Sequence, residues 1–187
     1  MLEVARKHFG DHLVVLPEAA TIVFGGGFPR GASAAARRAA QRAIFRVQIE
    51  LETMALEEGR ARAILCDRGT VDGVAYWPDS PESFWDAVGT THADQLARYS
   101  TVIHLRTPPA GNGYNHANRV RVESAEEAAL IDERIAAAWS PHPRRFFIES
   151  DRSFIAKAAR ALELILAETA ADVDPARGGL PSSPPAP

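Results

Sequence analysis

Four short and largely apolar runs recur along the chain: Leu13–Leu16, Ala63–Cys66, Thr101–Leu105 and Phe146–Ile148. The apolar residues in them are continuous rather than alternating with polar ones. Strands buried on both faces of a sheet have this pattern, because both rows of side chains contact a covering layer. The runs therefore predict four buried β-strands.

A longer pattern between residues 32 and 59 has apolar side chains at spacings of three and four. Its members are Ala40, Ile44, Val47, Leu51 and Met54. This spacing places them on one stripe of an α-helix, and Gly59 is a typical residue to end it. We therefore predict a helix that packs along this stripe.

Three further helices are predicted. One covers 82–99, a second covers 124–139 and opens with a capping-box-like Ser124–Glu127, and the last begins at Asp151 or Ser153. Strands that alternate with helices pair in parallel and are covered on both faces. The expected fold class is α/β, as a three-layer α/β/α sandwich with a parallel sheet.

The composition is that of one soluble domain: 187 residues, 46% hydrophobic and 24% charged. A net charge of −3 argues against a nucleic-acid partner, and Cys66, the single cysteine, cannot form an internal disulfide. No apolar signal-peptide segment opens the chain, and no run of about 18 apolar residues is present. We expect a cytoplasmic protein without integral membrane association. The domain is predicted over 1–169, followed by a disordered proline-rich tail, 170–187.

Charged residues follow each predicted strand: Glu18, Asp67–Arg68, Arg106 and Glu149. In parallel α/β sheets, ligands bind beyond the carboxyl ends of the strands, so these residues mark a candidate site. The alternative is that strand ends are simply where the chain meets water.

The segment Ile64–Trp77, ILCDRGTVDGVAYW, is the most specific in the chain. An acid directly after a buried strand, here Asp67, is how phosphate-loop proteins hold Mg²⁺, in this case through water. Arg68 is a candidate for contact with phosphate or substrate.

Two later residues of this segment are candidates for binding a substrate. The carboxylate of Asp72 suits a substrate hydroxyl, and it equally suits capping a turn with Gly73. Tyr76 can stack on a substrate ring, whereas aromatic residues at this density, Trp77 included, more often lie in a core.

A glycine-rich segment, Gly25–Arg30, precedes the long predicted helix without matching a phosphate-binding loop. No Gly-Lys-Ser/Thr follows it, and lysine is absent from residues 10–156. We interpret it as a substrate-side loop, with Arg30 as a candidate anion contact. His104, inside a predicted strand, is interpreted as a core residue with satisfied hydrogen bonds.

The motifs VVLPEAA, ILCDRG and IHLRTP and a late HP-x-R strand occur in this order. Together they resemble the AAA-type predicted ATPases, whose fold is that of the NadR-like nicotinamide riboside kinases and deoxynucleoside kinases. The resemblance covers Leu2 to about Ala167. It implies a P-loop NTPase fold, ATP or GTP with Mg²⁺, and a small-molecule acceptor. A eukaryotic branch with the LPEAA feature is described as binding GTP and phosphatidic acid.

The resemblance also implies roles for individual residues. Glu18 matches the acid that activates the substrate hydroxyl, and a carboxylate is suited to take that proton. Asp67–Arg68 matches the DR pair after the family's third strand. Residues 114–123, with Arg119 and Arg121, match a lid whose arginines neutralise charge on the transferring phosphoryl group. The alternative for that segment is a solvated basic loop.

The family's first strand and its GxxxxGK[ST] loop are absent from these 187 residues. Residues 1–9 resemble the back half of the helix that follows that loop. In the family's strand order 2-3-1-4-5 the first strand is central, so its absence would leave two edges unpaired and the chain marginally stable. We expect either a natural protein that starts upstream, or a degenerate remnant or partner-dependent binding module.

Two functions follow from these observations. The first is ATP- or GTP-dependent phosphoryl transfer to a small hydroxylated acceptor, with Glu18, Asp67 and Arg68 as the catalytic residues. The second is a nucleotide-binding switch or lipid-binding module without kinase activity. The 187 residues alone are expected to bind ATP or GTP poorly, because neither Lys7 nor Lys157 is placed as a phosphate-loop lysine.

Overall fold

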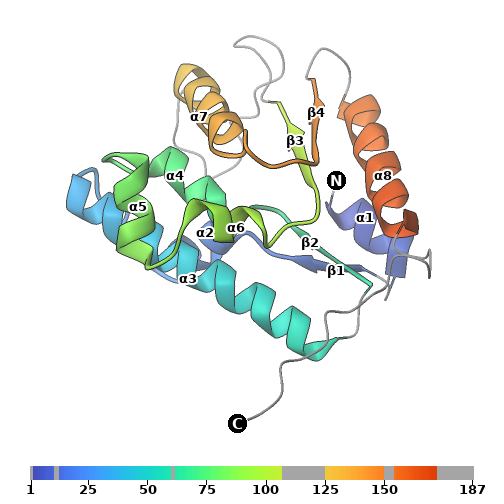
Figure 1. Cartoon of the computed structure of the whole chain (residues 1–187), viewed down its shortest axis with the longest axis horizontal. Coiled ribbons are helices and arrows are strands. Elements are labelled where there is room, and N and C mark those ends of the chain that lie inside the picture. The colour runs from blue at the N-terminus through green and yellow to red at the C-terminus, as the bar shows by residue number, and fades with distance from the viewer. Residues whose placement is uncertain (1, 11–12, 60–61, 107–124, 150–153, 172–187) are drawn as a thin grey trace.

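The computed structural model describes residues 2–10, 13–59, 62–106, 125–149 and 154–171. Within them, strands and helices alternate (Figure 1). The order is α1 (Leu2–Phe9), β1 (Leu13–Leu16), α2 (Ala19–Gly25), α3 (Ala34–Glu58), β2 (Ala63–Cys66), the 3-10 turn η2 (Thr70–Asp72), α4 (Gly73–Tyr76), α5 (Pro81–Val88), α6 (His92–Leu96), β3 (Val102–Leu105), α7 (Ala125–Ala138), β4 (Arg145–Ile148) and α8 (Phe154–Ala171). All four predicted strands are present, with bounds that differ from the predicted ones by at most one residue. They are less buried than predicted, since no residue of β2 is fully buried and Phe147 of β4 is 43% exposed.

The strands pair in parallel, as predicted, and in the described part of the chain they form two separate pairs. β1 pairs with β2, with Leu16 opposite Cys66, and β3 pairs with β4, with Leu105 opposite Ile148. These are the pairs 2-3 and 4-5 of the strand order that the resemblance implies. The α/β class with parallel strands is therefore confirmed, while a single continuous sheet is not formed by the described residues.

Helices cover both faces of the strands. Val102 of β3 packs against an aromatic cluster that includes Phe84 of α5 and Trp139 at the end of α7. The next residue, Ile103, packs on the opposite side, against a cluster that joins α1, β1 and α8. Successive strand residues point to opposite faces, so β3 has a packed cluster on each face. Figure 1 shows α1 and α8 side by side on one side of the molecule and α3 and α7 on the other.

The buried face of α3 differs from the predicted apolar stripe. Its buried residues are Ala40, Gln41, Phe45, Gln48, Glu52 and Ala55. Of the predicted stripe, Met54 is 49% exposed, and the stripe is rotated by about one residue from the buried face. The prediction was wrong here because it counted apolar residues, whereas Gln48 and Glu52 are buried by virtue of their hydrogen bonds. The ends were predicted correctly, since Gly59 has the left-handed conformation that ends helices, at φ 59°.

The predicted helix over 82–99 is two helices, α5 and α6. Gly89 lies between them with a φ of 75°, and its N–H donates to Trp85 O at 2.9 Å to close α5. Thr91 then starts α6 by accepting a hydrogen bond from the Asp94 N–H. The sequence Gly-Thr-Thr carried both a stop and a start signal that the single-helix prediction overlooked.

Several predictions fall outside the described residues. These are the capping residue Ser124, the lid over 114–123 and the tail from 172 onward. α8 extends to Ala171, two residues past the predicted end of the domain. In the segments that the structure describes, no helix has the length and apolarity needed to cross a bilayer.

Candidate functional site

The carboxyl ends of β1 and β2 bring two predicted site residues together. Because Leu16 lies opposite Cys66 in a parallel pair, the residues that follow each strand emerge at one edge. There Glu18 Oε1 lies 3.8 Å from Arg68 Nε. Glu18 also stands at the start of α2, where its other oxygen accepts the Thr21 hydroxyl at 2.5 Å. The structure therefore gives the first predicted acid and the predicted arginine one shared location.

Asp72 joins the same group from the far side of Arg68. Its Oδ2 lies 3.5 Å from Arg68 Nη1, and its Oδ1 accepts a hydrogen bond from the Trp139 indole N–H at 2.5 Å. The side chain is buried and makes no cap hydrogen bond at α4. Both carboxylate oxygens therefore have partners, and one partner is a core tryptophan that the sequence did not link to this motif.

The acidic neighbours of Arg68 favour its charged form. Burial disfavours the cation, but Asp72, and after it Tyr76, Glu18 and Asp67, outweigh that effect and raise the pKa of Arg68. Since an arginine is already protonated at any physiological pH, the site holds a permanent positive charge between carboxylates. An anionic ligand can take the place of one of these carboxylates beside the Arg68 guanidinium.

Two glycines of the ILCDRGTVDG motif are required by close packing. A Cβ on Gly69 would lie 2.5 Å from Trp139 Cζ2, and a Cβ on Gly73 would lie 2.7 Å from Phe84 Cζ. Gly69 has an ordinary φ of −100°, so at this position the need is for space rather than for an unusual backbone. The glycines thus let the loop after β2 lie directly on the aromatic cluster.

The other predicted residues of this segment have different environments. Asp67 is exposed at the end of β2, as a metal-facing acid requires. Tyr76 is partly buried and packs against the aromatic cluster, while Trp77 is buried within it and donates its indole N–H to Ser83 Oγ at 2.8 Å. The core interpretation is therefore confirmed for Trp77.

The two remaining predictions concern arginines. Arg30 is exposed, and its guanidinium lies 3.9 Å from the centre of the Phe24 ring, at the opposite end of α2 from Glu18. Arg119 and Arg121 lie outside the described residues.

A second charged group lies at the carboxyl end of β3. His104 is buried, and its Nε2 lies 3.1 Å from Asp132 Oδ1, which supports its interpretation as a satisfied core residue. Arg106 Nη1 lies 2.9 Å from Asp132 Oδ2, and the Lys157 ammonium donates to the Arg106 backbone carbonyl. The Asp132 carboxylate of α7 therefore contacts His104 of β3 and Arg106, the residue that follows β3.

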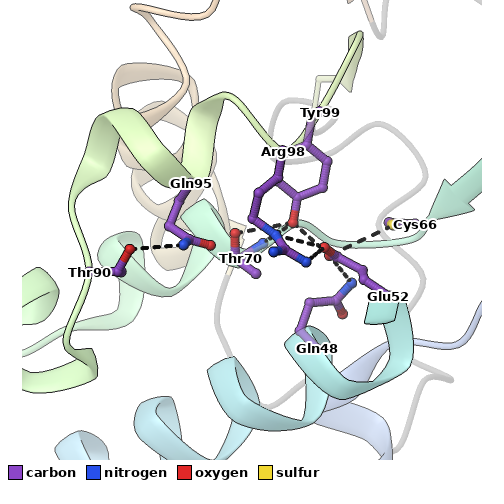
Figure 2. Close-up of polar contacts among 8 residues, drawn as sticks. All are labelled: Gln48, Glu52, Cys66, Thr70, Thr90, Gln95, Arg98 and Tyr99. Carbon is purple, nitrogen blue, oxygen red and sulfur yellow. Dashed lines mark hydrogen bonds and ion pairs between the residues drawn. The ribbon is translucent and has the colours of Figure 1, made fainter. Parts of the chain in front are cut away.

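A buried network behind β2 was not predicted (Figure 2). At its centre is Glu52 of α3, which accepts hydrogen bonds from Arg98 Nη2 at 2.6 Å and the Tyr99 hydroxyl at 2.7 Å. The signal in the sequence was the run of polar residues at helical spacing, Gln41, Gln48 and Glu52, on the side of α3 that carries Phe45. Its partners, 46 and 47 residues away in sequence, could not be found from spacing.

The described residues fit part of a nucleotide and magnesium site. In the segments that the structure describes, no group of three or more His, Cys, Asp or Glu side chains is placed so that it could hold a metal ion. Mg²⁺ keeps several waters and needs one or two carboxylates, which the exposed Asp67 can supply. A triphosphate also needs a lysine at a glycine-rich turn. Lys7 lies in α1 and Lys157 in α8, where it donates to a backbone carbonyl.

A family model described as AAA domain matches residues 2–156. The chain belongs to the AAA domain family. Membership assigns this AAA-domain protein to the P-loop nucleotide-binding class, in agreement with the broad resemblance that the motifs carry. Comparisons with curated proteins and with solved structures gave no match.

Proposed function

We propose that this AAA-domain protein takes part in ATP- or GTP-dependent phosphoryl transfer to a small hydroxylated acceptor. The observation that carries the proposal is the approach of Glu18 to Arg68 at the shared carboxyl edge of β1 and β2. Phosphoryl transfer needs a carboxylate near the attacking hydroxyl and a cation near the transferred group. One edge of this molecule supplies both groups within a few ångströms.

Glu18 is the proposed base. It is about one-quarter exposed, at 28% of its side chain, so an acceptor hydroxyl can reach it. Its hydrogen bond from the Thr21 hydroxyl fixes one oxygen, which leaves the oxygen nearer Arg68 to take the acceptor's proton. The proton then stays on Glu18 Oε1 until the product leaves.

Arg68 is the proposed electrostatic partner of the transferred group. Its distances of 3.8 and 3.5 Å to Glu18 and Asp72 are longer than those of close charge-assisted hydrogen bonds, which are about 2.7–2.9 Å. The guanidinium can therefore turn one edge toward a phosphate oxygen while Asp72 still restrains it. Arg119 and Arg121 are proposed to add positive charge from the lid.

Asp67 is the proposed magnesium-facing acid. Its place directly after β2 lets it accept hydrogen bonds from the water shell of the ion. When bound, Mg²⁺ would neutralise negative charge on the phosphates. Arg30, Asp72 and Tyr76 are proposed to contact the acceptor. Asp72 would do so with Oδ2, which lies 3.5 Å from Arg68 Nη1, because Oδ1 is held by Trp139.

The phosphate cradle is proposed to come from a segment that is not among these 187 residues. The support is the absence of a Gly-Lys-Ser/Thr sequence and the placement of the two lysines. A chain of residues 1–187 should then bind ATP or GTP too weakly to measure easily. Extending it at the N-terminus with the upstream coding sequence should restore binding if that sequence encodes an apolar strand and GxxxxGK[ST].

The test is Mg²⁺-dependent binding and hydrolysis of ATP and GTP by the extended chain, with and without a panel of nucleosides. Acceptor-stimulated turnover that is lost in Asp67→Asn, with the fold retained, supports the kinase. Tight GTP binding without turnover by any acceptor would instead support a switch, with phosphatidic acid vesicles as the lipid arm. Micromolar Mg²⁺-dependent binding by the unextended chain would overturn the proposed external cradle.

A further inference from the structure

The loop between β2 and α4 is held from behind by hydrogen bonds that reach across three parts of the chain (Figure 2). The Thr70 N–H donates to the Tyr99 hydroxyl oxygen at 2.7 Å, and Tyr99 lies just before β3. The Tyr99 hydroxyl in turn donates to Glu52 Oε1 of α3 at 2.7 Å. Thr70 begins η2, the turn that leads from Arg68 to Asp72. The backbone of the candidate site is thus linked to a buried carboxylate that does not touch it.

The direction of these hydrogen bonds is dictated by Glu52. An ionised carboxylate can only accept, and its hydrogen-bond partners in the described segments are donors. They are Gln48 Nε2 at 2.8 Å, Arg98 Nε at 3.1 Å, the Tyr99 hydroxyl at 2.7 Å and the Cys66 thiol at 3.9 Å. Since Tyr99 has one hydroxyl proton and gives it to Glu52, its oxygen is left to accept from the Thr70 N–H. A glutamine at position 52 would carry an NH₂ group with two N–H donors. Its side chain would then no longer act only as an acceptor toward its neighbours.

A second contact joins the same network to Asp72. The Tyr99 ring packs edge-on against Trp139, with ring centres 5.1 Å apart, and the Trp139 indole N–H holds Asp72 Oδ1. Gly69 lies against both rings. The turn is therefore restrained at Thr70 by the Tyr99 hydroxyl and at Asp72 by Trp139.

We propose that Glu52 is a positioning residue for the candidate site: through Tyr99 and Thr70 it fixes the turn that aims Arg68 and Asp72. The part of this inference that concerns turnover rests on the proposed function. The part that concerns the loop does not, because it predicts only how strongly the Thr70 backbone N–H is held. Among the described residues, Glu52 is linked to the loop through Tyr99 and through Cys66, whose Sγ lies 3.9 Å from Glu52 Oε1. Tyr99→Phe leaves the Cys66 contact in place and so isolates the route through Tyr99.

The test is amide hydrogen exchange of the full chain, resolved at Thr70, in Glu52→Gln. The variant keeps the size of the side chain and changes its hydrogen-bonding pattern. Exchange at the Thr70 amide should rise by about fivefold or more beyond any change in global stability, as expected for weakening one buried hydrogen bond. The NMR signal of the Trp139 indole N–H, assigned with Trp139→Phe, should also shift.

The matched control is Thr90→Val, which removes a neighbouring hydrogen bond outside the network. Thr90 Oγ1 accepts from Gln95 Nε2 at 3.0 Å (Figure 2). This variant should lower stability without changing exchange selectively at Thr70. Tyr99→Phe, which keeps the ring on Trp139, is the second test variant and should reproduce the effect of Glu52→Gln at Thr70.

Kinetic measurements distinguish a positioning role of Glu52 from a purely structural one. In the extended chain, Glu52→Gln should lower kcat for acceptor phosphorylation by about tenfold while KM for the nucleotide changes by less than about twofold. The same loss in Thr90→Val would show that general destabilisation is the cause. Unchanged Thr70 exchange in both Glu52→Gln and Tyr99→Phe would overturn the inference, whatever the kinetics show.

Discussion

The loop after β2 has two unlike sides. On the first, Arg68 lies 3.8 Å from Glu18 and 3.5 Å from Asp72, and 34% of its side chain is exposed. On the second, Glu52 is 5% exposed and its bonds to Arg98 and Tyr99 are 2.6 and 2.7 Å long. Long, partly solvated ion pairs can be exchanged for a ligand, whereas short, buried hydrogen bonds keep the backbone still. The proposed ligand-binding groups and the buried hydrogen bonds that support them therefore lie on opposite sides of one short loop.

The largest expected effect comes from removing the centre of the buried side. Glu52→Ala should lower the free energy of unfolding by about 2–4 kcal/mol, because it leaves the Arg98 cation and the donors of Gln48 and Tyr99 without their acceptor. Urea unfolding measures the change. Glu50→Ala, an exposed position on the same helix, is the control and should stay within about 0.5 kcal/mol of the wild type. Equal losses in the two variants would contradict the comparison.

A smaller loss of stability is expected from adding one methyl group where the loop packs against Trp139. Gly69→Ala would place a Cβ 2.5 Å from Trp139 and should cost about 1–3 kcal/mol. Gly25→Ala is the matched control, since a Cβ there meets nothing within 4 Å, and thermal unfolding should show little change or a slight gain. A neutral Gly69→Ala would mean that the indole can move aside and that the contact does not hold the loop.

High pH should lower the free energy of unfolding through Cys66 and Tyr99, which lie on the buried side of the loop. Burial, and after it the charge of Glu52, raises the pKa of the Cys66 thiol from 9.0 to about 12, and the pKa of Tyr99 is raised by the same two causes. Below about pH 8 both groups are largely protonated in the folded and unfolded states, so neither group makes stability depend on pH there. Between about pH 9 and 12 the unfolded thiol loses its proton while the folded one keeps it, so the free energy of unfolding falls, by an amount on the order of 1 kcal/mol. The fall should be reduced in Cys66→Ala, as urea unfolding near pH 8 and near pH 10.5 would show; an identical slope in the two proteins would remove Cys66 from this account.

The smallest stability effect is expected on the exposed side. Arg68→Gln should cost about 1 kcal/mol or less, because its ion pairs are long and partly solvated. The same change should abolish most acceptor phosphorylation in the extended chain. A stability loss as large as that of Glu52→Ala would show that Arg68 is a structural residue and would sink its proposed role.

The fold was predictable where one local signal was sufficient. Continuous apolar runs located β1 to β4, and the parallel pairing followed from the helices between them. The buried face of α3 was missed because Glu52 is stabilised by Arg98, a partner that pattern alone cannot reveal. The break at Gly89 was missed although its signal was local.

The candidate site was predictable in part for a related reason. Residues that follow adjacent parallel strands share an edge, so the sequence predicted that charged residues after the strands gather there, and Glu18 and Arg68 do so. The orientation of Asp72 depends on Trp139, 67 residues away, and such pairings are decided by tertiary packing. The supporting side of the loop was therefore beyond the reach of sequence patterns, while the exposed side was not.

The most direct measurement is acceptor-dependent turnover by Glu18→Gln in the N-terminally extended chain. The account predicts a fall in kcat of about 10²–10⁴, as for loss of a general base, with the nucleotide Kd changed by less than about twofold. Glu50→Gln should leave both quantities unchanged. Wild-type kcat in Glu18→Gln, in an extended chain that does show acceptor-stimulated turnover, would contradict the claim that the edge of β1 and β2 carries the chemistry.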